Sequence, residues 1–261
     1  MTRLLRSHGG IFIVLAMLSF AQAATVPEKP LELYLLIGQS NMAGRGIVEP
    51  QDQVVHPRVF TFNTNNAWVP ATDPLHSDRP TAGVGLGSAF GRLMAERDPA
   101  VRIGLIPCAV GGTPIIRWQK GADLYEAAVQ RARLAAKDGR IVGVLWHQGE
   151  ADSGQETTAA IYARQLDTMI RDLRADLSLP NLPVVVGQLG AFYTSDPFQG
   201  TVNAALKDTP KRVPRTAWVS TEGLKDKGDK THFDSAGYRE LGRRYFQAMV
   251  PLLPAESVPA K

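Results

Sequence analysis

The chain has 261 residues, with 29 Lys or Arg against 25 Asp or Glu, and a formal net charge of +4. This near balance, without blocks of like charge or clustered aromatic residues, excludes the usual footprint of a nucleic-acid-binding or polybasic membrane-binding protein. Its one cysteine, Cys108, cannot form an intramolecular disulfide and is expected in the core, and the scattered histidines lack the paired spacing of zinc sites.

The first 23 residues have the features of a secretory signal peptide. Two arginines precede an apolar run over residues 11–20, and residues 21–23 supply a small-x-small cleavage site. The run is shorter than the roughly 20 residues that span a bilayer, which favours cleavage over an uncleaved anchor. We therefore predict a signal peptide over residues 1–23 and a single secreted or periplasmic domain over 24–261, without a membrane anchor after cleavage.

The apolar run over residues 33–37 stops at Gly38 and leads directly to Ser40. Such aliphatic runs are typical of buried parallel strands, and chemistry in open α/β sheets gathers at the carboxyl ends of these strands. Ser40 is thus a candidate nucleophile, although a serine after a strand more often caps the next helix. Met42 stands where an α/β-hydrolase nucleophile elbow needs glycine, which excludes that elbow.

Residues 45–80 contain five prolines, too many for a continuous helix. A long irregular segment is usually functional or carries small strands of its own, and residues 58–62 alternate as one such strand would. We expect this segment to overhang the site.

The rest of the chain alternates strand and helix. Helices are expected near residues 86–98, 124–135, 162–177, 202–207 and 238–249, the last capped by Asp234, and strands near 101–106, 141–146, 184–186 and 217–219. This alternation predicts parallel strands with right-handed crossovers and helices on both faces. The expected fold is a three-layer α/β/α sandwich around a central parallel sheet, as in flavodoxin-like proteins.

Ester hydrolysis by serine needs a base, a group that orients the base, and donors where negative charge develops. Asp229 lies three residues before His232, in an expected turn just ahead of the last helix. Histidine suits the role of base because its pKa is near neutral. Considered alone, His232 would more often be a solvated loop histidine.

Four motifs in order along the chain carry a family resemblance: Gly-Gln-Ser-Asn-Met at 38–42, Gly-Gly-Thr-Pro at 111–114, Trp-His-Gln-Gly-Glu-Ala-Asp at 146–152 and Asp-x-x-His at 229–232. Together they resemble the SGNH hydrolases, in the branch of sialate O-acetylesterase-like and carbohydrate esterase family 6 (acetylxylan esterase-like) proteins. The resemblance implies an SGNH-type fold and a serine esterase without metal or organic cofactor. Such an enzyme removes O-acetyl groups from an acetylated polysaccharide, oligosaccharide or sialic acid through an acyl-serine intermediate.

The resemblance also implies roles for individual residues. Ser40 would be the nucleophile, His232 the general base and Asp229 the orienting acid. Glu150 stays open as an alternative acid or as support for the site, because the resemblance to carbohydrate esterase family 6 admits the glutamate of this motif as the acid and this chain has both acidic residues.

The implied oxyanion donors are the backbone N–H of Ser40, a backbone N–H of the glycine turn and the side-chain amide of Gln148, where other branches have asparagine. The family pattern favours Gly112 over Gly111 for the second donor.

Candidate substrate contacts lie within the motifs or close to them: Gln39, Asn41, Gly111, Arg117, Trp118 and His147. Two alternatives remain at this point, a carboxylesterase for other small acyl esters and a catalytically inactive carbohydrate-binding relative. Substitution of Ser40 separates the inactive relative from the enzymes. The sequence leaves the oligomeric state open.

Overall fold

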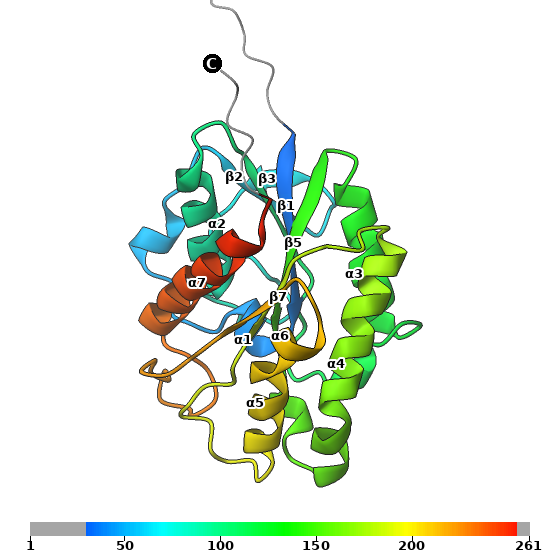
Figure 1. The fold of residues 1–261 in the computed structure, drawn as a ribbon. Helices are drawn as coiled ribbons and strands as arrows, with labels where there is room; N and C mark the ends of the chain where they lie inside the picture. Colours follow the sequence, from blue (N-terminus) through cyan, green and yellow to red (C-terminus); the bar gives the residue numbers. More distant parts are fainter. Residues whose placement is uncertain (1–29, 255–261) are drawn as a thin grey trace, which may run out of the picture.

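The computed structural model of the protein describes residues 30–254, so the predicted signal peptide over residues 1–23 lies outside the described residues. Seven strands form one sheet in its centre (Figure 1). In chain order they are β1 (Leu31–Gly38), β2 (Val59–Phe62), β3 (Trp68–Pro70), β4 (Ile103–Pro107), β5 (Gly139–His147), β6 (Val184–Gly187) and β7 (Thr216–Val219).

The strand order across the sheet is β3-β2-β4-β1-β5-β6-β7. Neighbouring strands are parallel throughout, except that β3 runs antiparallel to β2. The expected parallel sheet is thus confirmed, with a small hairpin added at one edge. Asn63 shapes that hairpin, because its side-chain oxygen accepts the N–H groups of Asn65 and Ala67.

Helices cover both faces of the sheet, as predicted. The α-helices are α1 (Ser40–Ala43), α2 (Leu86–Arg97), α3 (Asp123–Ala135), α4 (Glu156–Asp176), α5 (Gln199–Lys207), α6 (Thr209–Arg212) and α7 (Ser235–Met249), and the 3-10 helices are η1 (Pro50–Gln53), η2 (Ile115–Trp118), η3 (Glu150–Asp152) and η4 (Val250–Leu252). Helices α2 and α7 lie on one side of the sheet, and α3, α4 and α5 lie on the other (Figure 1). Within the described part of the chain, no helix is both long and apolar enough to cross a membrane.

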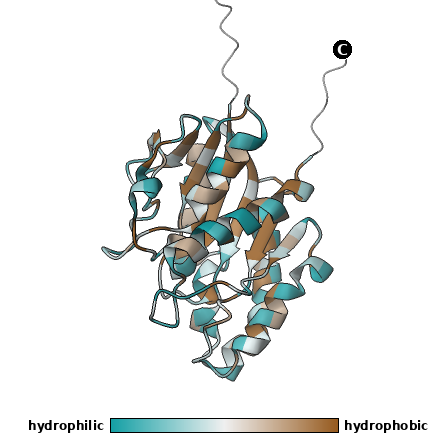
Figure 2. Ribbon diagram, turned by 90° about the vertical axis from the view of Figure 1, so that its left-hand side faces the viewer, coloured by the Kyte–Doolittle hydropathy of each residue, from teal (hydrophilic) through white to brown (hydrophobic). Residues whose placement is uncertain are grey.

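Strand β1 is buried from both sides, which explains its nearly continuous apolar sequence. Leu33, Leu35 and Ile37 enter the core beneath α3 and α4, whereas Tyr34 and Leu36 enter the core beneath α2 and α7. This alternation follows from the two-residue period of a strand. Figure 2 shows the apolar strands inside and the hydrophilic outer faces of the helices.

The predicted helices and parallel strands are all present, with ends shifted by a few residues. Asp234 caps α7 as expected, since its carboxylate accepts the Gly237 N–H at 2.6 Å. Strand β3, helix α6 and the 3-10 helices were not predicted, because segments of three or four residues are too short to show a periodic pattern.

The proline-rich segment over residues 45–80 is fixed to the helices beside it. Arg239 on α7 binds the carboxylates of Asp52 at 2.7 Å and Glu49 at 2.5 Å. Asp73 accepts a hydrogen bond from Ser88 on α2 at 2.8 Å. The segment is therefore anchored to α2 and α7, the two helices on one face of the sheet.

Candidate active site

The carboxyl ends of β1 and β5 meet immediately before Ser40. Gly38 allows this contact, because it adopts a φ of +136° and a Cβ at this position would lie 2.1 Å from the His147 carbonyl oxygen. Glycine is required where two backbones approach so closely. Ser40 then becomes the first residue of α1, pointing toward the loop that precedes α7.

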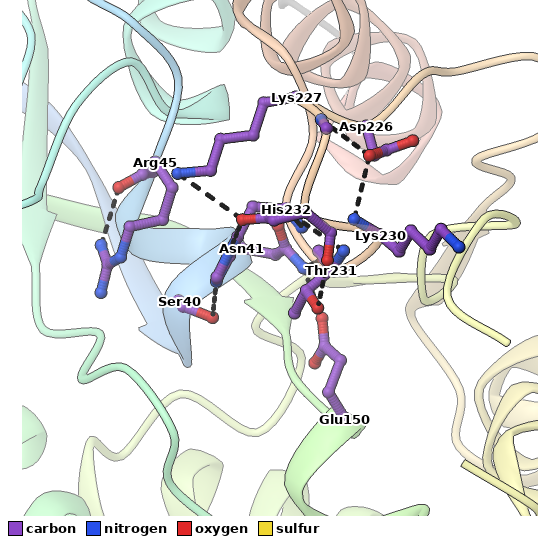
Figure 3. A network of polar contacts seen from close by, with 12 residues as sticks. Ser40, Asn41, Arg45, Glu150, Asp226, Lys227, Lys230, Thr231 and His232 are labelled. Atoms are coloured by element: carbon purple, nitrogen blue, oxygen red, sulfur yellow. Dashed lines mark hydrogen bonds and ion pairs between the residues drawn. The ribbon is translucent and has the colours of Figure 1, made fainter. Parts of the chain in front are cut away.

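Ser40, His232 and Asp229 form a continuous hydrogen-bonded chain. Figure 3 shows Ser40 facing His232. The Ser40 Oγ lies 3.0 Å from Nε2 of His232, and Nδ1 of His232 lies 2.7 Å from Oδ2 of Asp229. The second carboxylate oxygen of Asp229 accepts the backbone N–H groups of His232 at 2.8 Å and of Thr231 at 3.0 Å. The imidazole is thereby oriented with one nitrogen facing the hydroxyl.

Asp229 is held in its charged form. Partial burial acts to raise its pKa, but hydrogen bonds from the backbone and ring of His232 and from the Thr231 N–H outweigh burial and lower this pKa to about 2. The Lys227 ammonium adds a positive charge 3.6 Å from the same carboxylate. Asp229 is therefore negative throughout the range in which a neutral histidine can act as a base.

The turn that carries Asp229 and His232 is shaped by a residue that the sequence analysis did not identify. Oδ1 of Asp226 accepts the N–H groups of Gly228 at 2.8 Å and Lys230 at 2.9 Å. Lys230 has a φ of +57°, a left-handed conformation that this contact stabilises. The Asp-x-Gly spacing, typical of a side-chain-stabilised turn, was the available signal.

Asn41 joins the nucleophile to the base-bearing turn. Its Nδ2 donates to Oε1 of Glu150 at 2.6 Å and to the Thr231 carbonyl at 3.0 Å, and its Oδ1 accepts the Tyr238 hydroxyl at 2.7 Å. Asn41 is fully buried. Its side chain connects α1, η3 and α7, and both polar atoms of its amide have protein partners.

Glu150 lies in a different environment from Asp229. Its Oε1 accepts the Asn41 amide, while its Oε2 is buried without a hydrogen-bond partner among residues 30–254. Burial raises the pKa of Glu150 to about 7. Of the two acidic residues left open by the sequence, Asp229 contacts the His232 ring and Glu150 reaches it only through Asn41 and the Thr231 backbone.

The Gly111–Gly112 turn follows β4 and packs beside Ser40. The Gly111 N–H donates to Oδ2 of Asp78 at 2.8 Å, whereas the N–H groups of Gly112 and Ser40 have no hydrogen-bond acceptor among the described residues. Gly112 has a φ of +73°, and a Cβ at this position would meet open space. Of the two glycine N–H groups, that of Gly112 is therefore the one free to bind a ligand.

Asp78 and Arg45 form a buried ion pair behind this turn. Nη2 of Arg45 lies 2.7 Å from Oδ2 of Asp78, and the two side chains are only 6% and 3% exposed. Burial acts to raise the pKa of Asp78, but the bonds from Arg45 and Gly111 lower it overall. Both residues come from the proline-rich segment, and no motif pointed to them.

Gln148 is fully buried and faces protein acceptors. Its Nε2 lies 3.2 Å from Oε1 of Gln39, 3.0 Å from the Thr113 carbonyl and 2.5 Å from Oδ2 of Asp152. The same Asp152 oxygen accepts the Ile115 N–H at 2.9 Å. Two amide hydrogens are thus shared by three acceptors, so the expected free donor at Gln148 is not what this geometry presents.

Three other residues that were expected to contact substrate, Trp118, His147 and Gln39, are buried in the structure. Trp118 packs edge to face on Trp146 at 5.6 Å, and its indole N–H donates to Thr113. His147 is fully buried against the Tyr245 hydroxyl at 3.0 Å, and burial lowers its pKa to about 3. Buried Gln39 serves the Gln148 network described above.

Arg117 is exposed, but Asp123 binds its guanidinium. The neighbouring Ile116 is an exposed apolar side chain, four residues after Gly112 in the sequence. Among residues 30–254, no group of three or more His, Cys, Asp or Glu side chains is arranged to hold a metal ion.

Comparison with known proteins gives consistent matches. A family model described as "Carbohydrate esterase, sialic acid-specific acetylesterase" matches residues 30–251. A probable carbohydrate esterase of Arabidopsis thaliana is 34% identical over 245 residues, covering 85% of this chain and 91% of that protein. A solved A. thaliana structure superposes with a TM-score of 0.79 and 31% identity, over 85% of this chain and 98% of that one. A carbohydrate acetylesterase from Xanthomonas citri shares the fold, with a TM-score of 0.68 and 21% identity, over 87% of this chain and 57% of that one.

Proposed function

The chain belongs to the carbohydrate esterase family of sialic acid-specific acetylesterases, and on that premise we propose that Ser40, His232 and Asp229 are its catalytic triad. The family resemblance read from the four motifs is confirmed, and the chain is a carboxylic ester hydrolase for acetylated carbohydrate. The observation that carries the residue assignment is the hydrogen-bonded chain from the Ser40 Oγ through the His232 ring to the Asp229 carboxylate.

The reaction proceeds in two halves. His232 Nε2 takes the proton of the Ser40 hydroxyl while Oγ attacks the acetyl carbonyl carbon, and the resulting tetrahedral intermediate collapses as the sugar oxygen leaves with that proton. Water then attacks the acetyl-serine ester and gives a proton to His232. Collapse of the second intermediate releases acetate, and the proton on His232 returns to Ser40. Asp229 stays charged and stabilises the imidazolium formed in each half.

The negative oxygen of both intermediates is bound by the backbone N–H groups of Ser40 and Gly112. These donors have no acceptor among the described residues, and they are held at the start of α1 and in the turn after β4, so they are already in place for an oxyanion. Gln148 supports the glycine turn through Thr113 and Asp152 rather than acting as a third donor. Glu150 positions the base-bearing turn through Asn41.

We also propose that the protein is exported to the periplasm or the medium and that the mature chain begins at Ala24. The charged, apolar and small-residue sections of residues 1–23 support this proposal. The intact mass of protein recovered from culture supernatant and from a periplasmic extract tests it, and a mature protein that still starts at Met1 would contradict it.

Ser40→Ala tests the nucleophile. Acetate release from an acetylated carbohydrate should fall by about 10⁴-fold or more, because the attacking oxygen is lost. The matched control is Ser235→Ala, which removes a hydroxyl that donates to the Ile47 carbonyl and should keep most activity. A fluorophosphonate should also label wild type on the Ser40 peptide. Hydrolysis that survives in Ser40→Ala would refute the assignment.

A further inference from the structure

Phe233 directly follows the proposed base His232 and anchors the turn that carries it. Its side chain is fully buried, and three aromatic rings meet it edge to face. The distances between ring centroids are 5.0 Å to Phe192, 5.5 Å to Tyr238 and 5.8 Å to His147. These rings come from the loop after β6, from α7 and from the end of β5. Because buried rings are closely packed, the position of Phe233 depends on all three neighbours.

Backbone hydrogen bonds join the two sides of this turn around Phe233. The Lys227 N–H donates to the His232 carbonyl at 2.9 Å, and the Asp234 N–H donates to the Lys225 carbonyl at 3.0 Å. A shift of the buried ring therefore moves the backbone that carries the base, and not only a single side chain.

Of the three rings around Phe233, only that of Phe192 is half-buried and lies in a loop. The Gly190 carbonyl accepts the Tyr193 N–H at 2.8 Å, which closes a tight turn with Phe192 at its corner. A Cβ on Gly190 would lie only 2.5 Å from Cζ of Phe192, so the ring covers this glycine. The ring is thus held between Gly190 and Phe233.

The same loop is attached to η3 on its other side. The Tyr193 hydroxyl donates to Oδ2 of Asp196 at 2.6 Å, and the Ser153 hydroxyl lies 2.9 Å from the same oxygen. The Ser153 carbonyl accepts the Phe198 N–H at 3.0 Å. Ser153 is fully buried and directly follows η3. The loop is thereby fixed to η3, while the ring at its corner packs on the base-bearing turn.

Resting on the proposed function, we propose that Phe192 is a positioning residue for His232. Its ring completes the packing around Phe233 and so maintains the distance of 3.0 Å between His232 Nε2 and the Ser40 Oγ. Proton transfer depends steeply on such geometry, and a misplacement of about 1 Å is enough to lower a rate by up to about 100-fold. The effect falls on kcat, because the proposed oxyanion donors lie at the start of α1 and after β4, away from this packing.

Phe192→Ala removes the ring and should lower kcat about tenfold or more, with KM within about threefold of wild type. The rate is expressed per active site, counted by labelling Ser40 to completion with a fluorophosphonate. A variant that is only less stable loses sites but keeps its rate per site. Phe192→Leu restores apolar volume against Phe233 and should recover kcat to within about threefold of wild type. A wild-type kcat in Phe192→Ala, or no recovery in Phe192→Leu, would overturn the proposal.

Phe246→Ala is the matched control. Phe246 on α7 is also half-buried against the core beneath α2 and α7, but its ring makes no contact with Phe233 among the described residues. This variant should lose thermal stability much as Phe192→Ala does, while its kcat stays at the wild-type value. An equal fall in kcat in both variants would show a general loss of packing and would also overturn the proposal.

Gly190→Ala moves the ring without removing it, since the added Cβ would lie 2.5 Å from Cζ of Phe192. Its kcat should fall about tenfold. In the double variant Gly190→Ala/Phe192→Leu, the shorter side chain avoids the clash, so kcat should return to the value of Phe192→Leu. Additive losses in the double variant would contradict the proposal. Failure of the proposed function gives a different result, because Ser40→Ala or His232→Ala would then retain hydrolysis of the acetylated carbohydrate.

Discussion

Two acidic side chains near the His232 turn differ in every property that decides whether a carboxylate can orient a base. Asp229 is partly exposed and receives hydrogen bonds from two backbone N–H groups and the His232 ring, so its pKa falls to about 2. Glu150 is buried with one hydrogen-bond donor, so its pKa rises to about 7. The more exposed carboxyl is thus the more acidic one.

This difference shows that the hydrogen-bond donors around a carboxyl, and not its burial, keep it ionised near neutral pH. A carboxylate that stabilises an imidazolium must remain ionised while the histidine gains a proton. Asp229 meets that requirement at any pH well above its pKa of about 2. Glu150 would be largely protonated below neutral pH, which suits a structural contact to Asn41.

Of the variants that test this comparison, Asp229→Asn should cause the largest fall in kcat. The amide would favour the wrong tautomer of His232 and could not stabilise its charge, so kcat should fall about 10³- to 10⁴-fold. Steady-state kinetics on an acetylated sugar measure the loss, with circular dichroism to show that the fold persists. Exposed Asp208→Asn, far from the site, is the control. A fall in kcat of less than tenfold would show that Asp229 is not the acid that orients His232.

Asp78 offers a third carboxyl, which is buried like Glu150 yet charged like Asp229 because Arg45 faces it. Asp78→Asn should lower kcat by roughly 10- to 100-fold with a smaller change in KM, since the Gly111–Gly112 turn loses its anchor and one oxyanion donor moves. Asp78→Asn leaves the buried Arg45 guanidinium without its partner. Adding Arg45→Met removes that charge, so the double variant should recover thermal stability while its kcat stays low. Full recovery of kcat in the double variant would show that charge burial alone caused the defect.

Glu150→Gln should have the smallest catalytic effect, below about tenfold in kcat, because Gln can still accept the Asn41 amide. A loss as large as that of Asp229→Asn would assign the acid role to Glu150. Asn41→Ala tests the same connection from its centre and should cost more, since it also releases Thr231 and Tyr238.

The two carboxyls should also affect stability with opposite dependence on pH. The raised pKa of Glu150 means that the folded state binds its proton more tightly than the unfolded state, so its contribution to stability is full below about pH 4.5 and is lost as pH rises through about 7. Between pH 5 and 8, Glu150→Gln should therefore gain roughly 1 to 3 kcal/mol of unfolding free energy relative to wild type.

The lowered pKa of Asp229 gives a contribution to stability that is present above pH 4 and lost toward pH 2. Urea unfolding at several pH values measures both, and a relative gain of Glu150→Gln at low pH would contradict the assignment.

Much of the fold could be predicted because its strands are buried on both faces and therefore appear as apolar runs, as in β1 and β5. The order of the strands and the hairpin through β3 could not, since no local pattern specifies which strands become neighbours. Ser40, His232 and Asp229 were identified because each occupies a strand end or a turn within a recognisable motif.

The rest of the site depends on burial, which a motif does not reveal. Trp118 follows a motif closely and His147 lies within one, so both resembled substrate contacts, yet their side chains are buried. Asp78 lies in a segment without periodicity, so only the folded chain brings it beside the glycine turn. The choice between Asp229 and Glu150 likewise depends on which groups donate hydrogen bonds to each carboxyl, and the folded structure is needed to see them.

The strands at the two edges of the sheet affect how the protein behaves at high concentration. Strand β3 has three residues and ends in Pro70, and β7 at the opposite edge has four. A foreign strand adding to either edge would find few backbone groups to pair with, and proline offers no N–H at one of them. Edges this short discourage the open-ended strand addition that leads to aggregation.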